Sequence, residues 1–226
     1  YQSHQKAIRA IESGLLQEEI VPVSVKQRKG EPVVVEIDEA PRKDTTVEKL
    51  SSLKPAFDRD GTITAGNAPG INDGAGALVL MSEDKAIDEG YKIGARIIGH
   101  AEIAVEAKDF PKTPGLVINE LLKKTEKSLD DIDLFEVNEA FAAVALASGK
   151  LANLDAEKVN VNGGAVALGH PIGASGARII LTLMYELKRR GGGIGIASIC
   201  SGGGQGDDIM IEVPKEKKKK NGVMRD

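Results

Sequence analysis

The stretch VNGGAVALGHPIGASG, from Val161 to Gly176, decides how the rest of the chain is interpreted. It is dense in glycine and contains one of the three histidines of the chain. Glycine at this density costs chain entropy, so it indicates backbone that turns tightly or approaches another group closely. Pro171 restricts the backbone directly after His170. An imidazole on such a loop is a candidate catalytic group, and a structural histidine is the competing interpretation.

The sequence on both sides of this loop alternates between strand and helix patterns. After the loop, apolar residues recur at helical spacing and predict a helix over 177–190. Helices are also predicted over 114–127 and, rich in alanine, from Asn138 to about residue 151. The predicted strands are 95–105, 133–137, 159–162, 195–200 and 208–213. This alternation predicts an α/β fold in which helices cover the faces of a layered sheet.

The first part of the chain has weaker patterns. They predict a helix over 1–13, a hairpin of strands 20–26 and 33–37, and short helices from a capping box at Thr45 and over 83–89. The run AGALVLM over 75–81 is apolar on both sides and predicts a buried central strand. A second unit is predicted from residue 83 to 213, after a first unit of residues 1–82 and before a charged, disordered tail at 214–226.

Composition excludes several classes of protein. Hydrophobic residues make up 41% of the 226 residues and aromatic residues only 3%, which predicts an aliphatic core. The formal net charge of −4 favours neither nucleic acid nor an anionic membrane as a partner. A single cysteine excludes an intrachain disulfide framework and is typical of a reducing compartment. Without a signal peptide pattern or a long apolar run, we expect a cytoplasmic protein.

Two further motifs accompany the histidine loop: NEAFA at 138–142 and CSGGGQG at 200–206. Together with GHPIGASGAR, and in this order and spacing, they resemble the C-terminal half of the thiolases, up to about Pro214. The resemblance implies an acyltransferase that forms or cleaves acetoacetyl-CoA or another 3-ketoacyl-CoA in fatty acid metabolism. It implies coenzyme A thioesters as substrates, no permanently bound cofactor or metal, and a homodimer or homotetramer for the complete protein. Residues 1–82 would then be a remnant of the N-terminal domain and the CoA-binding loop region.

The resemblance also implies roles for the motif residues. His170 would activate a nucleophilic cysteine and help to bind an oxyanion, and Asn138 would position a water in the same oxyanion hole. Cys200 would be the acid and base at the substrate α-carbon, because a thiol with an ordinary pKa of about 8.5 can be brought toward neutrality by its surroundings. The N–H of Gly202 would contribute to a second oxyanion hole. An N-cap for Asn138 and an inert buried thiol for Cys200 are the alternatives.

Contacts with the coenzyme A are implied by fewer residues. The segment 65–73, AGNAPGIND, resembles the thiolase loop that contacts the pantetheine arm, which makes Ala68, Pro69 and Gly70 candidates. Many thiolases have a serine where this chain has Pro69, so the hydroxyl and the N–H of that serine are lost here. Arg42 lies near the place of an arginine close to the nucleotide, and an ordinary surface arginine is the alternative.

One departure from the family pattern bears on activity. The nucleophilic cysteine of thiolases lies in their N-terminal half, and Cys200 is the only cysteine here. The sequence also begins within a helical pattern, so we expect the C-terminal portion of a thiolase without the acyl-carrying residue. A catalytically incomplete chain that binds acyl-CoA or a partner is the second hypothesis, and a Cys-His hydrolase is a weaker third. Ketoacyl synthases share the fold, but Asn138 with Cys200 argues against them.

The predicted topology leads to one geometric expectation. Parallel strands joined by a helix bring their carboxyl ends to one edge of a sheet. We therefore expect Asn138, His170 and Cys200 to converge there, with the functional atoms of His170 and Cys200 on the order of 3–6 Å apart.

Overall fold

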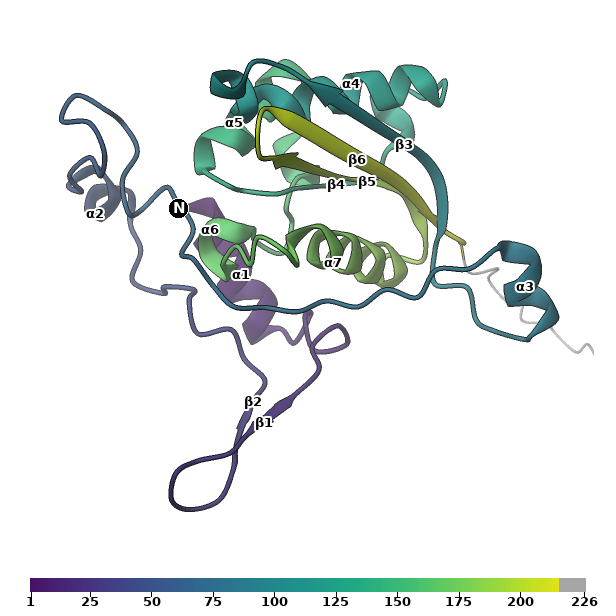
Figure 1. Ribbon diagram of the computed structural model, residues 1–226, viewed down its shortest axis with the longest axis horizontal. Coiled ribbons are helices and arrows are strands. Elements are labelled where there is room, and N and C mark those ends of the chain that lie inside the picture. The colour runs from purple at the N-terminus through teal and green to yellow at the C-terminus, as the bar shows by residue number, and fades with distance from the viewer. Residues whose placement is uncertain (216–226) are drawn as a thin grey trace, which may run out of the picture.

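A four-stranded mixed sheet forms the centre of the computed structural model, which describes residues 1–215 (Figure 1). Strand β6 is antiparallel to both of its neighbours, β3 and β5, and strand β4 is parallel to β5. From one edge to the other the order is β3 (Arg96–Ala104), β6 (Gln205–Val213), β5 (Gly193–Ser201) and β4 (Leu134–Val137). The tail predicted at 214–226 falls, from residue 216 onward, outside the described residues.

Helices cover both faces of this sheet, as Figure 1 shows. One face carries α4 (Thr113–Lys124) and α5 (Ala142–Leu151). The opposite face carries α7 (Ser175–Arg189), with the short α6 (Ala165–Leu168) and α1 (Gln2–Glu12) on the same side. The predicted layered α/β/α fold is therefore confirmed.

Side chains alternate between these two faces along each strand. In β5, Ile196 joins the core under α4, and Ala197 joins the core under α7. The core is aliphatic, as the composition predicts, with Phe135 as the single aromatic side chain among its largest fully buried members within residues 1–215. Helix α4 packs on this core through four buried apolar residues: Val117, Ile118, Leu121 and Leu122.

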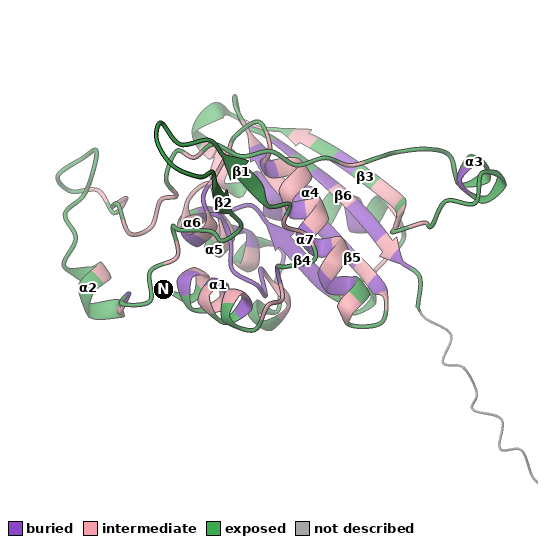
Figure 2. Cartoon of the chain, turned by 90° about the horizontal axis from the view of Figure 1, so that it is seen from below, coloured by how far each residue is buried: buried purple, intermediate pink, exposed green. Residues whose placement is uncertain are grey.

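The elements before this sheet pack loosely. The predicted hairpin is present but short, with antiparallel strands β1 (Val23–Val25) and β2 (Val33–Val35), and all six residues are exposed (Figure 2). The short helices are α2 (Val47–Ser51) and α3 (Glu83–Asp88), and the N-cap of α2 is Thr46 rather than Thr45. Three 3-10 turns complete the elements: Ala107–Lys112, Leu129–Asp131 and Ala156–Lys158.

Three element predictions are wrong. Residues 75–81 form no strand, and Val79 is 85% exposed, because no strand within residues 1–215 pairs with this apolar run. Residues 159–162 contribute only one isolated bridge, from Val159 to Phe135, because the backbone turns to a positive φ at Asn160. Helix α5 begins at Ala142, so Asn138 lies in a connection after β4 and does not open the helix.

No helix within residues 1–215 is both long enough and apolar enough to cross a membrane.

Asp208, in the middle of β6, is a buried carboxyl group without a hydrogen-bond partner for either oxygen among residues 1–215. Burial raises its pKa well above the usual range, and the nearby Ser198 hydroxyl opposes this only in part. Asp208 therefore keeps its proton in the folded chain at pH values where the unfolded chain has lost it. The stability that depends on this proton is present at low pH and is lost as the pH rises toward the raised pKa.

We predict that Asp208→Asn, which mimics the protonated acid, removes this pH dependence. Above about pH 4 the free energy of unfolding of the wild type should fall by up to about 1.4 kcal/mol per pH unit relative to the variant. Urea unfolding at a series of pH values measures the difference. The exposed neighbour Asp207 provides the control: its charge is the smallest of the causes that shift the pKa of Asp208, so Asp207→Asn should keep most of the pH dependence of the wild type. Parallel curves for Asp208→Asn and wild type would contradict the prediction.

Candidate active site

Asn138 and His170 meet at the carboxyl edge of the parallel strands. Asn138 directly follows β4, and its backbone N–H donates to Ser198 O at 2.9 Å, which continues the β4–β5 pairing. Its side-chain Nδ2 lies 3.4 Å from His170 Nε2. Asn138 is buried and His170 is half-buried. The expected convergence of these two side chains is confirmed.

The other ring nitrogen of His170 contacts the start of α7. His170 Nδ1 lies 2.6 Å from Ser175 Oγ, and Ser175 Oγ donates to the carbonyl oxygen of Pro171 at 3.0 Å. Ser175 is fully buried, so water does not compete for its hydroxyl. The imidazole is thus held on both sides, by an amide and by a hydroxyl.

Burial lowers the pKa of His170, and the positive charge of Arg178 lowers it further. The ordinary pKa of histidine is about 6.5, so the imidazole is neutral at pH 7. A neutral imidazole can accept a proton, as a general base must.

Cys200 lies two residues beyond the Ser198 that pairs with Asn138, near the end of β5. Its thiol is buried, and burial raises its pKa. Residues 1–215 therefore do not bring this thiol toward neutrality, because burial removes water and no cationic group is among the causes of its shift. The glycine turn after it is open, with Gly202 exposed and no atom close to where a side chain would be. The separation of Cys200 and His170 stays a prediction, as do the roles of Cys200 and Gly202.

The segment 65–73 lies against the histidine loop. Ile71 forms a parallel bridge with His170, and Asn67 O accepts a hydrogen bond from Ala142 N at 2.8 Å. The CoA candidates Ala68, Pro69 and Gly70 stand between these two contacts. Arg42 is exposed, and its backbone N–H donates to His4 Nδ1 at 3.0 Å. The loop with these three candidates thus lies beside His170, because the adjacent Ile71 pairs with it. Arg42 instead contacts His4 of helix α1.

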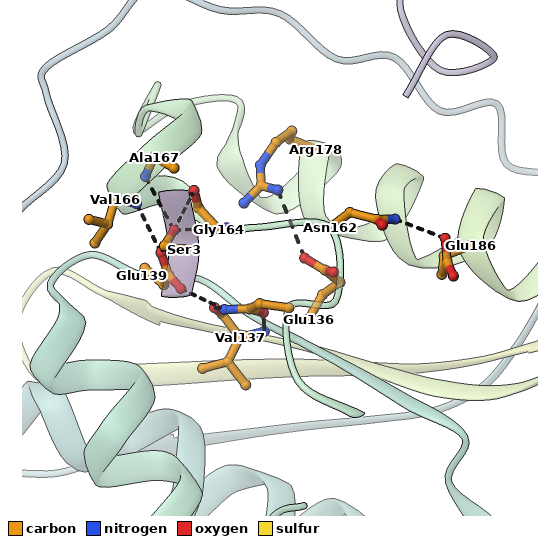
Figure 3. Close-up of polar contacts among 11 residues, drawn as sticks. Ser3, Glu136, Val137, Glu139, Asn162, Gly164, Val166, Ala167, Arg178 and Glu186 are labelled. Atoms are coloured by element: carbon orange, nitrogen blue, oxygen red, sulfur yellow. Dashed lines mark hydrogen bonds and ion pairs between the residues drawn. The ribbon is translucent and has the colours of Figure 1, made fainter. Parts of the chain in front are cut away.

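The buried carboxylate of Glu139 ties three segments together (Figure 3). Its Oε2 accepts from Ser3 Oγ at 2.7 Å and from Val166 N at 3.0 Å. Its Oε1 accepts from Asn160 Nδ2 at 3.1 Å, and Asn160 also holds both backbone groups of Val137. Helix α1, the end of β4 and helix α6 are therefore fixed relative to one another, directly beside Asn138.

A second buried acidic side chain, Glu136 in β4, faces Arg178 of α7 (Figure 3). Arg178 Nη1 lies 3.9 Å from Glu136 Oε2, and neither atom has a hydrogen-bond partner within residues 1–215. Burial raises the pKa of Glu136 to about 8, although Arg178 acts in the opposite direction. Burial thus favours the protonated form of Glu136, and the same Arg178 also lowers the pKa of His170.

Other features of the surface lie away from these residues. One hollow of about 320 Å³ is lined by α1 and the segment after β2, including Ile11, Leu16 and Ile37. A second, of about 440 Å³, is lined by residues such as Asp133, Lys158 and Arg190. Within residues 1–215 no group of three His, Cys, Asp or Glu side chains has the arrangement to hold a metal ion.

Sequence reasoning did not identify Ser175 or the partners of Glu139 as parts of this site, and it included Asn72 only as a member of the segment 65–73. Asn72 packs against Gly169, and its Oδ1 is buried without a hydrogen-bond partner among the described residues, as is that of Asn138. The spacing of Ser175, five residues after His170 at a helix start, was the one available signal. The partners of Glu139 and Asn72 come from distant segments, which no local pattern connects.

Family models match both parts of this chain. The thiolase C-terminal domain matches residues 91–213, and the thiolase N-terminal domain matches residues 1–84. The chain belongs to the thiolase family. The resemblance of its three motifs is therefore confirmed.

Individual thiolases are similar over nearly all of this chain. It is 52% identical over 209 residues to an acetyl-CoA acetyltransferase of Pseudomonas aeruginosa, covering 92% of this chain and 53% of that protein. The crystal structure of the Bacillus anthracis acetyl-CoA acetyltransferase matches with a TM-score of 0.90 and 53% identity, over 94% of this chain and 54% of that one. Human mitochondrial 3-ketoacyl-CoA thiolase in complex with CoA matches with a TM-score of 0.89 and 44% identity, over 94% and 53% of the two chains. This thiolase chain spans about half the length of the curated relatives it matches.

Gly169, directly before the histidine of this thiolase chain, has a backbone conformation that disfavours any side chain. Its φ is +103°, and an added Cβ would lie 2.6 Å from Asn72 Cγ. We predict that Gly169→Ala lowers the free energy of unfolding by about 1–3 kcal/mol, because the left-handed backbone and the packing are both strained. Urea unfolding measures the effect.

Gly173, four residues further along the loop, is the matched control. It has no atom within 4 Å of an added Cβ, and its φ is not positive. Gly173→Ala should therefore stay within about 0.5 kcal/mol of the wild type. Equal effects of the two substitutions would show that Gly169 does not constrain the loop.

Proposed function

We propose that this chain carries the acid-base and oxyanion-binding part of a thiolase that forms or cleaves acetoacetyl-CoA or another 3-ketoacyl-CoA. The observation that carries the proposal is the contact between Asn138 and His170 at the sheet edge where β5 ends near Cys200. In this proposal the substrates are coenzyme A thioesters, and no cofactor is permanently bound.

The chemistry requires a nucleophile that carries an acyl group, a base and acid at the α-carbon, and donors for two oxyanions. Neutral His170 suits the activation of the nucleophile and donation to an oxyanion once it is protonated. The buried Asn138 Oδ1, which lacks a protein partner among residues 1–215, suits the holding of a water in the same hole. Gly202 is exposed, and its N–H suits the second hole.

Cys200 is proposed as the acid and base at the α-carbon. In cleavage the nucleophile bonds to the keto carbon, the bond between the α-carbon and that carbon breaks, and the Cys200 thiol protonates the departing carbanion. In condensation the Cys200 thiolate removes a proton from the α-carbon, and the carbanion attacks the acyl thioester, whose sulfur leaves as a thiolate. Burial raises the pKa of Cys200, so its resting form is the thiol, which is the form that protonates the carbanion.

The acyl carrier is proposed to lie outside this chain, because Cys200 is its only cysteine. The loop of Ala68, Pro69 and Gly70 is proposed to contact the pantetheine arm, supported by the Ile71–His170 bridge beside it. Arg42 is proposed to lie near the nucleotide. For the complete protein we also propose a homodimer or homotetramer that is located in the cytoplasm and takes part in fatty acid metabolism.

The single cysteine also supports a second candidate function, a thiolase-like chain that binds acyl-CoA without turnover. The two candidates differ in what this chain does when a complete thiolase is assembled around it. A chimera provides the test, in which the part of the Pseudomonas aeruginosa relative that this chain does not cover is joined to this chain.

We predict that the chain alone releases no acetyl-CoA from acetoacetyl-CoA and CoA, and that the folded chimera does. The reason is that an acyl carrier is present only in the chimera. Acetyl-CoA is quantified by chromatography over time. Turnover by the chain alone would contradict the absence of an acyl carrier, and a folded but inactive chimera would favour the binding function.

We predict that two substitutions in the active chimera affect different steps. Cys200→Ser should slow condensation by about 10²–10⁴ and spare acylation, because a hydroxyl is too weak an acid for the α-carbon step. His170→Ala should slow both steps, each by at least about 10²–10³, because the imidazole serves the nucleophile and an oxyanion. Burst kinetics separate acylation from condensation.

The exposed His100 in β3 provides the control for His170, because it lies outside the three motifs and His100→Ala should leave both steps unchanged. A normal acylation burst with His170→Ala, or equal losses in both steps with Cys200→Ser, would contradict the proposed roles.

A further inference from the structure

We propose that Ser175 is a positioning residue that sets the tautomer of His170, so that Nδ1 carries the proton and Nε2 is the basic nitrogen. The proposed function gives no role to Ser175. Its catalytic meaning rests on the proposed function, whereas the tautomer itself is a property of this chain without substrate.

The argument starts from the single proton of the Ser175 hydroxyl. That proton is directed at the carbonyl oxygen of Pro171, 3.0 Å away. With its proton engaged there, Ser175 Oγ has only lone pairs to offer to His170 Nδ1 at 2.6 Å. A contact of this length requires a donor on one side, so the proton lies on Nδ1.

The opposite side of the ring agrees with this assignment. His170 Nε2 faces Nδ2 of Asn138 at 3.4 Å, and an amide nitrogen is a donor only. This contact favours Nε2 as the acceptor of the neutral ring, but at 3.4 Å it is much longer than the 2.6 Å contact of Nδ1 with Ser175. The hydrogen bonds then form one chain. The Asn138 amide donates to Nε2, Nδ1–H donates to the Ser175 hydroxyl, and that hydroxyl donates to Pro171 O.

The backbone at the start of α7 holds this arrangement in place. The N–H groups of Ala174 and Ser175 also donate to Pro171 O, at 2.8 and 2.9 Å, so the acceptor and the serine are fixed relative to each other. Ser175 is fully buried in the first turn of the helix. The residue directly after the histidine thus supplies the oxygen that orients the serine proton, and the serine orients the histidine.

The consequence concerns which nitrogen faces the site. The nitrogen that carries the proton is set by the hydrogen bond that the other nitrogen makes. Without an acceptor at Nδ1, the proton could occupy either nitrogen, and the base would be blocked in the fraction of molecules with Nε2–H. Ser175 would therefore act on the rate through the population of the competent tautomer, and it would not touch the substrate.

Nitrogen-15 NMR of the imidazole rings tests the proposal on this chain, at about pH 8, where an imidazole with a pKa of about 6.5 or lower is neutral. The chain has three histidines, so the signals can be assigned with single substitutions. For His170 we expect Nδ1 in the range of protonated nitrogen and Nε2 in the range of unprotonated nitrogen. His4 is an internal reference of the opposite kind, because its Nδ1 accepts a hydrogen bond from Arg42 N at 3.0 Å.

Substitutions then separate positioning from packing. Ser175→Ala should change the His170 signals from one tautomer to a mixture of two, and Ser175→Thr should restore the single tautomer. Ser148 is equally buried and its hydroxyl has no partner within residues 1–215, so Ser148→Ala is the matched control and should leave His170 unchanged.

Two results would overturn the proposal. One is a wild-type His170 with its proton on Nε2, which needs no variant to fold. The other is a folded Ser175→Ala chain with an unchanged tautomer. Both are independent of turnover, so an inactive chimera would refute the proposed function without affecting this inference.

Discussion

The buried carboxylate of Glu139 is the interaction on which the site depends. It accepts hydrogen bonds from three segments that are far apart in the sequence, through Ser3, Asn160 and Val166. Hydrogen bonds to a buried charged acceptor contribute more than neutral ones, and the loss of such an acceptor leaves its donors unsatisfied. Since Asn138 precedes Glu139 and α6 leads into His170, the same carboxylate locates both side chains of the pair.

The sheet supplies the second constraint. Parallel pairing of β4 with β5 places the residue after β4 and the end of β5 at one edge, which is where Asn138 and Cys200 stand. Antiparallel β6 then returns beside β5, so the glycine turn after Cys200 projects from the same edge. The polar groups required for acid-base chemistry are thereby gathered where the backbone of connecting segments is free to turn.

Several titratable side chains of this chain are buried, and burial shifts their pKa values. Glu136 and Asp208 are held in a core that favours their protonated forms, and the pKa of Cys200 is raised for the same reason. These shifts follow from loss of water, which local sequence does not reveal. From the sequence, the pKa of Cys200 could have been lowered by its surroundings, but in the structure it is raised, because burial is the largest cause and no cation is among the causes.

The sequence by itself determined the family and the layered α/β/α fold. It also determined most helices and the strands with strong apolar periodicity. These features depend on local patterns and on short motifs, each of which is a continuous stretch of sequence. Tertiary structure alone decided which apolar runs pair. Residues 75–81 have the composition of a buried strand yet form none within residues 1–215, since pairing requires a neighbouring strand. Tertiary structure also decided that Ser175 contacts His170 and that Glu139 joins α1 to α6, because hydrogen bonds depend on distances that only the folded chain fixes.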